Sequence, residues 1–150
     1  MRFWVAVILC VAILGCVQQV PGAYYGTVTW VPDGDTIKLT NGEFVRYIGI
    51  DTPEFHYPKG PVEHFAEEAK DFNKRLVDGK VVRLEFDVER RDKYGRLLAY
   101  VYVDDMFVNA RMIEEGYAKI LTFPPNIKYA DKFLKLQRKA REEHKGLWAR

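Results

Sequence analysis

The order of its β-strand and turn patterns constrains the fold of this chain more than any other feature. Residues Tyr24–Val31 are rich in β-branched and aromatic side chains and stop at Pro32-Asp33-Gly34-Asp35, which favours a turn. A second strand pattern, Thr36–Thr40, ends at Asn41-Gly42, a strong hairpin signal, and a third covers Glu43–Ile50. Together these patterns predict three antiparallel strands in meander order.

A helix is predicted after this meander, followed by two further strands. Apolar side chains recur at helical spacing between Pro61, which suits a first helical turn, and Gly79, which suits the exit. The residues at this spacing are Val62, Phe65, Ala66, Ala69, Phe72 and Leu76. Strand patterns then cover Val81–Val88 and Leu97–Val103, joined by the charged turn Glu89–Arg96.

Five strands with one helix between the third and the fourth match the order of an OB-fold barrel. Two more helices are predicted at Val108–Glu115, closed by Gly116, and at Ile127–His144, and they would pack on the end of the barrel. The fold class we expect is therefore α+β, a five-stranded OB-fold barrel with three α-helices. Most aromatic side chains, including Trp30 and Trp148, are assigned to its core.

Composition limits the class of protein to which this chain can belong and the kinds of metal or disulfide site that it can contain. Its 150 residues suit one domain plus a short appendage, and 48% hydrophobic content allows a full core. The net charge of +2 is too small to indicate a nucleic-acid binder by bulk electrostatics. The only cysteines are Cys10 and Cys16, so residues 17–150 contain no disulfide and no cysteine-only metal site.

The first 16 residues have the pattern of an export leader. A short basic start precedes an apolar run that is shorter than the roughly 20 residues of a spanning helix, which favours a signal peptide. Ile13-Leu14-Gly15-Cys16 also resembles a bacterial lipobox, in which Cys16 would carry a lipid anchor, and an uncleaved membrane anchor is the third alternative. We expect a tether at residues 17–23, a domain at 24–150, and export to the outer face of the membrane or beyond.

Two aspartates are candidate metal ligands. A meander would place Asp35, after the first turn, and Asp51, after the third strand, at the same end of the sheet. Carboxylate and backbone carbonyl oxygens are the ligands that calcium prefers, and the Thr52 carbonyl could add one. Asp-Gly is also an ordinary turn, so Asp35 alone would be a weak signal.

Glu54, Arg46 and Arg96 are candidate catalytic residues. Glu54 beside a metal could deprotonate water, and each guanidinium could grip a phosphate and neutralise charge in the transition state. Each residue alone has an ordinary alternative: a capping box from Asp51 to Glu54, a surface position for Arg46, and pairing with Asp92 for Arg96. It is their joint occurrence that favours phosphodiester hydrolysis.

Through these candidate residues and the motifs around them, the chain resembles the thermonuclease family, the staphylococcal-nuclease-like OB-folds, over about residues 24–149. The matching motifs are Asp33-Gly34-Asp35-Thr36, Arg46-Tyr47-Ile48-Gly49-Ile50-Asp51-Thr52-Pro53-Glu54, Asp92-Lys93-Tyr94-Gly95-Arg96, Gly116-Tyr117-Ala118-Lys119 and Gly146-Leu147-Trp148. The segment Leu121–Pro125 departs from it, because it lacks the tyrosines that line the family's nucleotide pocket.

The resemblance implies calcium-dependent endonucleolytic cleavage of DNA and RNA that leaves 3′-phosphate ends. It assigns Asp35, Asp51 and the Thr52 carbonyl to the calcium ion, and contacts with the terminal phosphate of the nucleotide to Lys93 and Tyr94. It assigns the general base to Glu54 and the phosphate clamps to Arg46 and Arg96. We expect nucleic acid as the partner, no obligate protein partner, and a monomer. A non-catalytic OB-fold binding module and a calcium-stabilised structural domain are the alternatives.

Overall fold

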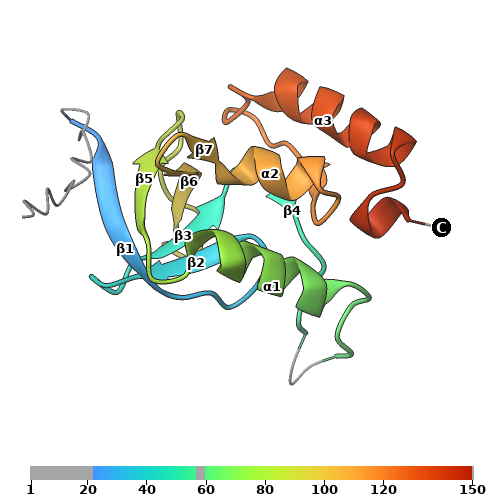
Figure 1. Ribbon diagram of the computed structural model, residues 1–150. Coiled ribbons are helices and arrows are strands. Elements are labelled where there is room, and N and C mark those ends of the chain that lie inside the picture. Colours follow the sequence, from blue (N-terminus) through green and yellow to red (C-terminus); the bar gives the residue numbers. More distant parts are fainter. Residues whose placement is uncertain (1–21, 57–59, 150) are drawn as a thin grey trace, which may run out of the picture.

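The computed structural model describes residues 22–56 and 60–149, and its centre is a closed five-stranded barrel (Figure 1). Neighbouring strands pair in the order β3-β2-β1-β5-β6, and a parallel pairing of β3 with β6 closes the barrel. The predicted OB-fold with its opening three-strand meander is confirmed. The barrel strands are β1 (Tyr24–Trp30), β2 (Thr36–Leu39), β3 (Phe44–Tyr47), β5 (Val81–Glu85) and β6 (Leu97–Val103).

Three helices and three short strands surround this barrel. In Figure 1, α1 lies below the barrel, and α2 and α3 lie together on one side of it. The helices are α1 (Ala66–Val77), α2 (Val108–Glu114) and α3 (Ala130–Glu142), followed by a 3₁₀ turn at Gly146–Trp148. The short strands are β4 (Gly49–Asp51), which pairs with β8 (Lys119–Leu121), and β7 (Met106–Phe107), which pairs antiparallel with the end of β6.

Alternating side chains of the strands fill the barrel. On β2 and β3, Ile37 and Val45 point inward and are fully buried, while their neighbours Lys38 and Phe44 face outward. Below the barrel, the Tyr47 hydroxyl donates to Asn73 Oδ1 of α1 at 2.8 Å, and Asn73 Nδ2 donates to the Asp33 carbonyl at 3.0 Å. Helix α1 therefore supports both β3 and the turn that precedes β2.

The predicted third strand is interrupted at Ile48. It continues as β4 from Gly49, whose φ of +80° is unfavourable for a side chain, and a Cβ there would lie 2.6 Å from the Phe133 ring. The Ile48 N–H donates to the Ala99 carbonyl at 3.0 Å, and the Ile48 carbonyl accepts from Asn109 Nδ2 at 2.9 Å. The bend lets β3 pair with β6 while β4 turns away to pair with β8.

Several local predictions were wrong. Helix α1 begins at Ala66, after Phe65 with a φ of +74°, so Pro61 lies outside its first turn. Strand β5 ends before Val88, and β7 and β8 were not predicted because two or three residues are too few to show a period. Trp30 is 51% exposed rather than in the core.

The predicted leader, including Cys16, lies outside the described residues, as does most of the tether at 17–23. Within residues 22–56 and 60–149, no helix has the length and apolar character needed to cross a membrane.

Asn109 provides a test of how the bend is held. It is fully buried, and its Oδ1 accepts from the Val101 N–H at 2.9 Å while its Nδ2 donates to Ile48. We expect Asn109→Ala to lower the free energy of unfolding by about 3 kcal/mol, because two buried backbone groups lose their partners. Urea unfolding would measure this. The exposed Asn41→Ala is the control, with an expected loss of about 1 kcal/mol or less. Equal losses in the two variants would contradict this role.

Candidate functional site

Arg46 is the centre of the candidate site. It points outward from β3, and its guanidinium bridges two carboxylates, with Nε 3.2 Å from Asp35 Oδ1 and Nη2 3.1 Å from Asp51 Oδ1. Its Nη1 donates to the carbonyls of Tyr47 and Ile50 at 2.9 and 2.8 Å. Because those carbonyls flank the bend between β3 and β4, the bend itself orients the guanidinium.

Asp35 is almost completely buried at the start of β2, and each of its oxygens accepts hydrogen bonds. Oδ2 accepts from the Thr52 N–H at 2.9 Å and from the Thr52 hydroxyl at 3.0 Å, and Oδ1 accepts from the Thr36 hydroxyl at 3.1 Å. The structure thus brings Asp35 close to Asp51, as the meander predicts, and places Thr52 and Arg46 in contact with Asp35. The contacts found for Thr52 use its N–H and hydroxyl, so its carbonyl as a ligand stays a prediction.

Negative charge is concentrated at this end of the barrel. Burial, and next the Asp35 carboxylate, raise the pKa of Asp33 to about 7. Burial, and next Asp35, also raise the pKa of Asp51, and Arg46 opposes this shift. Burial is the larger cause of both shifts, and repulsion between the carboxylates adds to it, so a cation bound here would counter that repulsion.

Glu54 lies beside this cluster and is more accessible. Its charge adds to the raised pKa of Asp51, and its side chain is 59% exposed. Its Oε2 is 3.7 Å from His56 Nδ1, and His56 Nε2 is 2.9 Å from Glu63 Oε1. As predicted, no helix begins at Phe55 or His56, and Phe55 forms an isolated bridge with Val62.

The turn before β6 presents a second group of basic residues. The Arg96 Nε donates to Asp92 Oδ2 at 2.7 Å, and Asp92 Oδ1 accepts from the backbone N–H groups of Tyr94 and Arg96. The pairing of Asp92 with Arg96, which was the ordinary alternative, is therefore present. Tyr94 is 72% exposed, and its ring centroid lies 5.1 Å from Lys93 Nζ and 5.5 Å from Arg96 Cζ.

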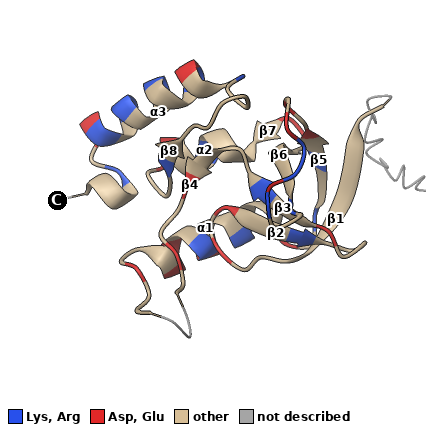
Figure 2. Cartoon of the chain, turned by 180° about the vertical axis from the view of Figure 1, so that it is seen from behind, with Lys and Arg blue, Asp and Glu red and all other residues tan. Residues whose placement is uncertain are grey.

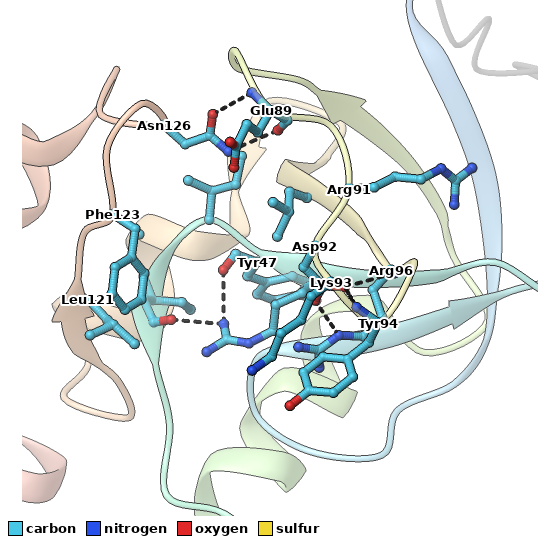
Figure 3. Close-up of a pocket in the computed structure, with 15 residues that line it drawn as sticks. Tyr47, Glu89, Arg91, Asp92, Lys93, Tyr94, Arg96, Leu121, Phe123 and Asn126 are labelled. Carbon is cyan, nitrogen blue, oxygen red and sulfur yellow. Dashed lines mark hydrogen bonds and ion pairs between the residues drawn. The ribbon is translucent and has the colours of Figure 1, made fainter.

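Arg46 and this turn line one pocket of about 680 Å³ (Figure 3). Lys93, Tyr94 and Arg96 lie on one side of it, and Leu121 and Phe123 lie on the opposite side. Figure 2 shows the same charged loop crossing the barrel beside β3. Asp35, Asp51, Thr52 and Glu54 do not line this pocket, so Arg46 is the residue that joins the carboxylates to it.

Two contacts that hold the loop were not predicted. Arg91 donates to both carboxylate oxygens of Glu43 at 2.9 Å and to the Gly95 carbonyl at 2.7 Å. Asn126 exchanges hydrogen bonds with the backbone of Glu89 at 2.8 and 2.9 Å. The partners are far apart in sequence, and no spacing rule could have paired them.

Among the described residues, no group of three or more His, Cys, Asp and Glu side chains is placed to hold a metal ion. The expectation from sequence was a weaker site with only two protein carboxylates, Asp35 and Asp51. Their oxygens are of the hard type that calcium accepts, and both carboxylates contact the same guanidinium, which places them at one site.

Comparison with known proteins shows the family to which the chain belongs. Residues 44–150 match the model of the staphylococcal nuclease homologues, and the chain belongs to this family. It is 46% identical over 123 residues to the SPbeta prophage-derived endonuclease YokF of Bacillus subtilis, covering 79% of this chain and 42% of that protein. It is 44% identical over 123 residues to endonuclease YncB of the same organism, covering 79% of this chain and 58% of that protein.

The thermonuclease of Staphylococcus intermedius is 42% identical over 123 residues, covering 80% of this chain and 73% of that protein. The chain therefore spans only about half the length of the two Bacillus relatives, and more of the staphylococcal one.

The Glu43–Arg91 ion pair gives a testable account of how the loop is held. We expect Glu43→Gln to accelerate amide hydrogen exchange several-fold at Gly95 and Arg96, because Arg91 loses the carboxylate that anchors it. Hydrogen-exchange NMR or mass spectrometry would measure the change. Asp78→Asn, which removes an exposed carboxylate 4.0 Å from Lys74 at the end of α1, is the matched control. Unchanged exchange at Arg96 in Glu43→Gln would show that the pair does not hold the loop.

Proposed function

We propose that the protein is a calcium-dependent endonuclease that hydrolyses phosphodiester bonds of DNA and RNA and leaves 3′-phosphate ends. The observation that carries this proposal is the position of Arg46, which lines the pocket together with Arg96 and also contacts Asp35 and Asp51. Membership of the staphylococcal nuclease family and the endonuclease and thermonuclease names of the relatives support it.

In this mechanism the two arginines bind the scissile phosphate. Arg46 is held by two backbone carbonyls, and Arg96 is directed by Asp92, so both guanidinium groups are oriented before substrate arrives. Water attacks phosphorus, the bond to the 5′-oxygen breaks, and the leaving 5′-oxygen takes up a proton from solvent to become a hydroxyl. Arg46 and Arg96 neutralise the charge that grows on the phosphoryl oxygens in the pentacovalent transition state.

Glu54 is the proposed general base. Its exposed carboxylate lies beside the acidic cluster, where it can take a proton from the attacking water. Lys93 and Tyr94 are proposed to contact the terminal phosphate of the bound nucleotide from the turn before β6. These two residues line the same pocket as both arginines.

Asp35 and Asp51 would hold the calcium ion, together with the Thr52 carbonyl. Bound there, a divalent cation supplies Lewis-acid stabilisation of phosphate charge. The Thr52 N–H and hydroxyl both donate to Asp35, which fixes the orientation of that carboxylate. Two carboxylates give a weak and open site, which suits a centre that substrate must enter.

Export is proposed on the leader pattern of residues 1–16, as a secreted, lipidated or membrane-anchored protein. Cleavage by the domain requires neither the lipid anchor nor a protein partner in this proposal, and we propose that the domain acts as a monomer.

Two substitutions test the catalytic roles. We expect Glu54→Gln and Arg96→Ala each to lower kcat by roughly a hundredfold or more, because each removes a group that acts in the transition state. Cleavage of single-stranded DNA with calcium would measure kcat, and thermal unfolding would confirm that the variants fold. Glu67→Gln, an exposed glutamate in the first turn of α1, is the control and should keep full activity. Normal turnover in either test variant would refute the role assigned to that residue.

A further inference from the structure

An aromatic residue that was expected in the core lies instead on the outside of the barrel. Trp30, at the end of β1, is 51% exposed, and its ring is 6.1 Å from that of Phe44 on β3 in an edge-to-face arrangement. Lys38 on β2 lies between them in the sheet, since it pairs with both Trp30 and Phe44. These three residues, called here the outer row, cross three neighbouring strands on one face.

The outer row is continuous with the candidate site. Phe44 and Arg46 are two residues apart on β3, so their side chains leave the same face at a separation of about 7 Å. This separation is comparable to the distance between successive nucleotides in an extended single strand. A strand whose phosphate is held by Arg46 can therefore continue across β3 and β2 toward Trp30 without leaving this face.

The outer row has the chemistry that single-stranded nucleic acid requires. Single strands are bound by aromatic rings on which bases stack and by cations that contact the backbone. Trp30 supplies an exposed ring, and Phe44 supports it from the side. Lys38 Nζ lies 5.3 Å from the Phe44 centroid, and within residues 22–56 and 60–149 it makes no ion pair. The nearby Glu43 carboxylate is paired with Arg91, so it does not compete for Lys38.

We infer that the outer row is a second nucleotide subsite, on which a base of the strand flanking the scissile phosphate stacks on Trp30 while Lys38 contacts its phosphate. This inference rests on the proposed nuclease function and deepens it. It makes the protein prefer a single strand several nucleotides long over a dinucleotide, which the pocket beside Arg46 alone would accommodate. The face of strands two and three is also where OB-folds in general bind oligonucleotides.

The test compares two substitutions at one position. Trp30→Leu keeps an apolar side chain against Phe44 but removes the aromatic face, and Trp30→Phe keeps a stacking surface. Dissociation constants for a single strand of roughly ten nucleotides would be measured by fluorescence anisotropy with EDTA present, so that no cleavage occurs. Cleavage with calcium would then give kcat/KM for this strand and for a dinucleotide.

We expect Trp30→Leu to weaken binding of the single strand about tenfold and to lower the ratio of its kcat/KM to that of the dinucleotide by a similar factor. Trp30→Phe should restore most of both. Leu134→Ala, on the exposed surface of α3, is the control and should match the unmodified protein. Circular dichroism and thermal unfolding would verify the fold of each variant.

Three results would contradict the inference or the proposed function, and they are distinguishable. An unchanged dissociation constant and an unchanged ratio in Trp30→Leu, with both substrates cleaved by the unmodified protein, would refute the subsite and leave the proposed function intact. Cleavage of neither substrate by the unmodified protein would refute the proposed function, and binding would then decide on the subsite alone. If Trp30→Leu instead reduced only cosedimentation with phosphatidylglycerol vesicles, the outer row would be a membrane contact.

Discussion

The bend at Ile48 and Gly49 is the constraint on which both the barrel and the site depend. Before the bend, β3 pairs with β6 and closes the barrel, and after it, β4 carries Asp51 toward β8. Asn109 and the Phe133 ring hold the bend from the α2 and α3 side, where there is no space for a Cβ at Gly49. A straight third strand could not satisfy both pairings.

Arg46 connects the bend between β3 and β4 to the candidate site. Its guanidinium binds the carbonyls on either side of the bend and, at the same time, the carboxylates of Asp35 and Asp51. The Arg46 side chain also lines the pocket that Arg96 lines from the turn before β6. The carboxylates and the basic side chains of the pocket are thus connected through Arg46.

The sequence predicted those parts of the structure that depend on short spacings. Alternation and the Asn41-Gly42 turn predicted the meander, and the meander brought Asp35 close to Asp51. Contacts between residues distant in sequence could not be predicted, as the Glu43–Arg91 ion pair and the two bonds of Asn109 show. Trp30 was assigned to the core with most of the other aromatic residues. The β1–β2 register shifts between Val28 and Trp30, however, and after this shift the Trp30 side chain lies on the outside of the barrel.

We propose that the carboxylates and the two arginines form one calcium-dependent hydrolytic site. The most direct measurement is cleavage of single-stranded DNA by the protein with calcium, and then with EGTA, followed by analysis of the ends. We expect degradation that requires calcium and leaves 3′-phosphate ends. Absence of cleavage by a folded protein that binds calcium would contradict it and would favour a non-catalytic binding module.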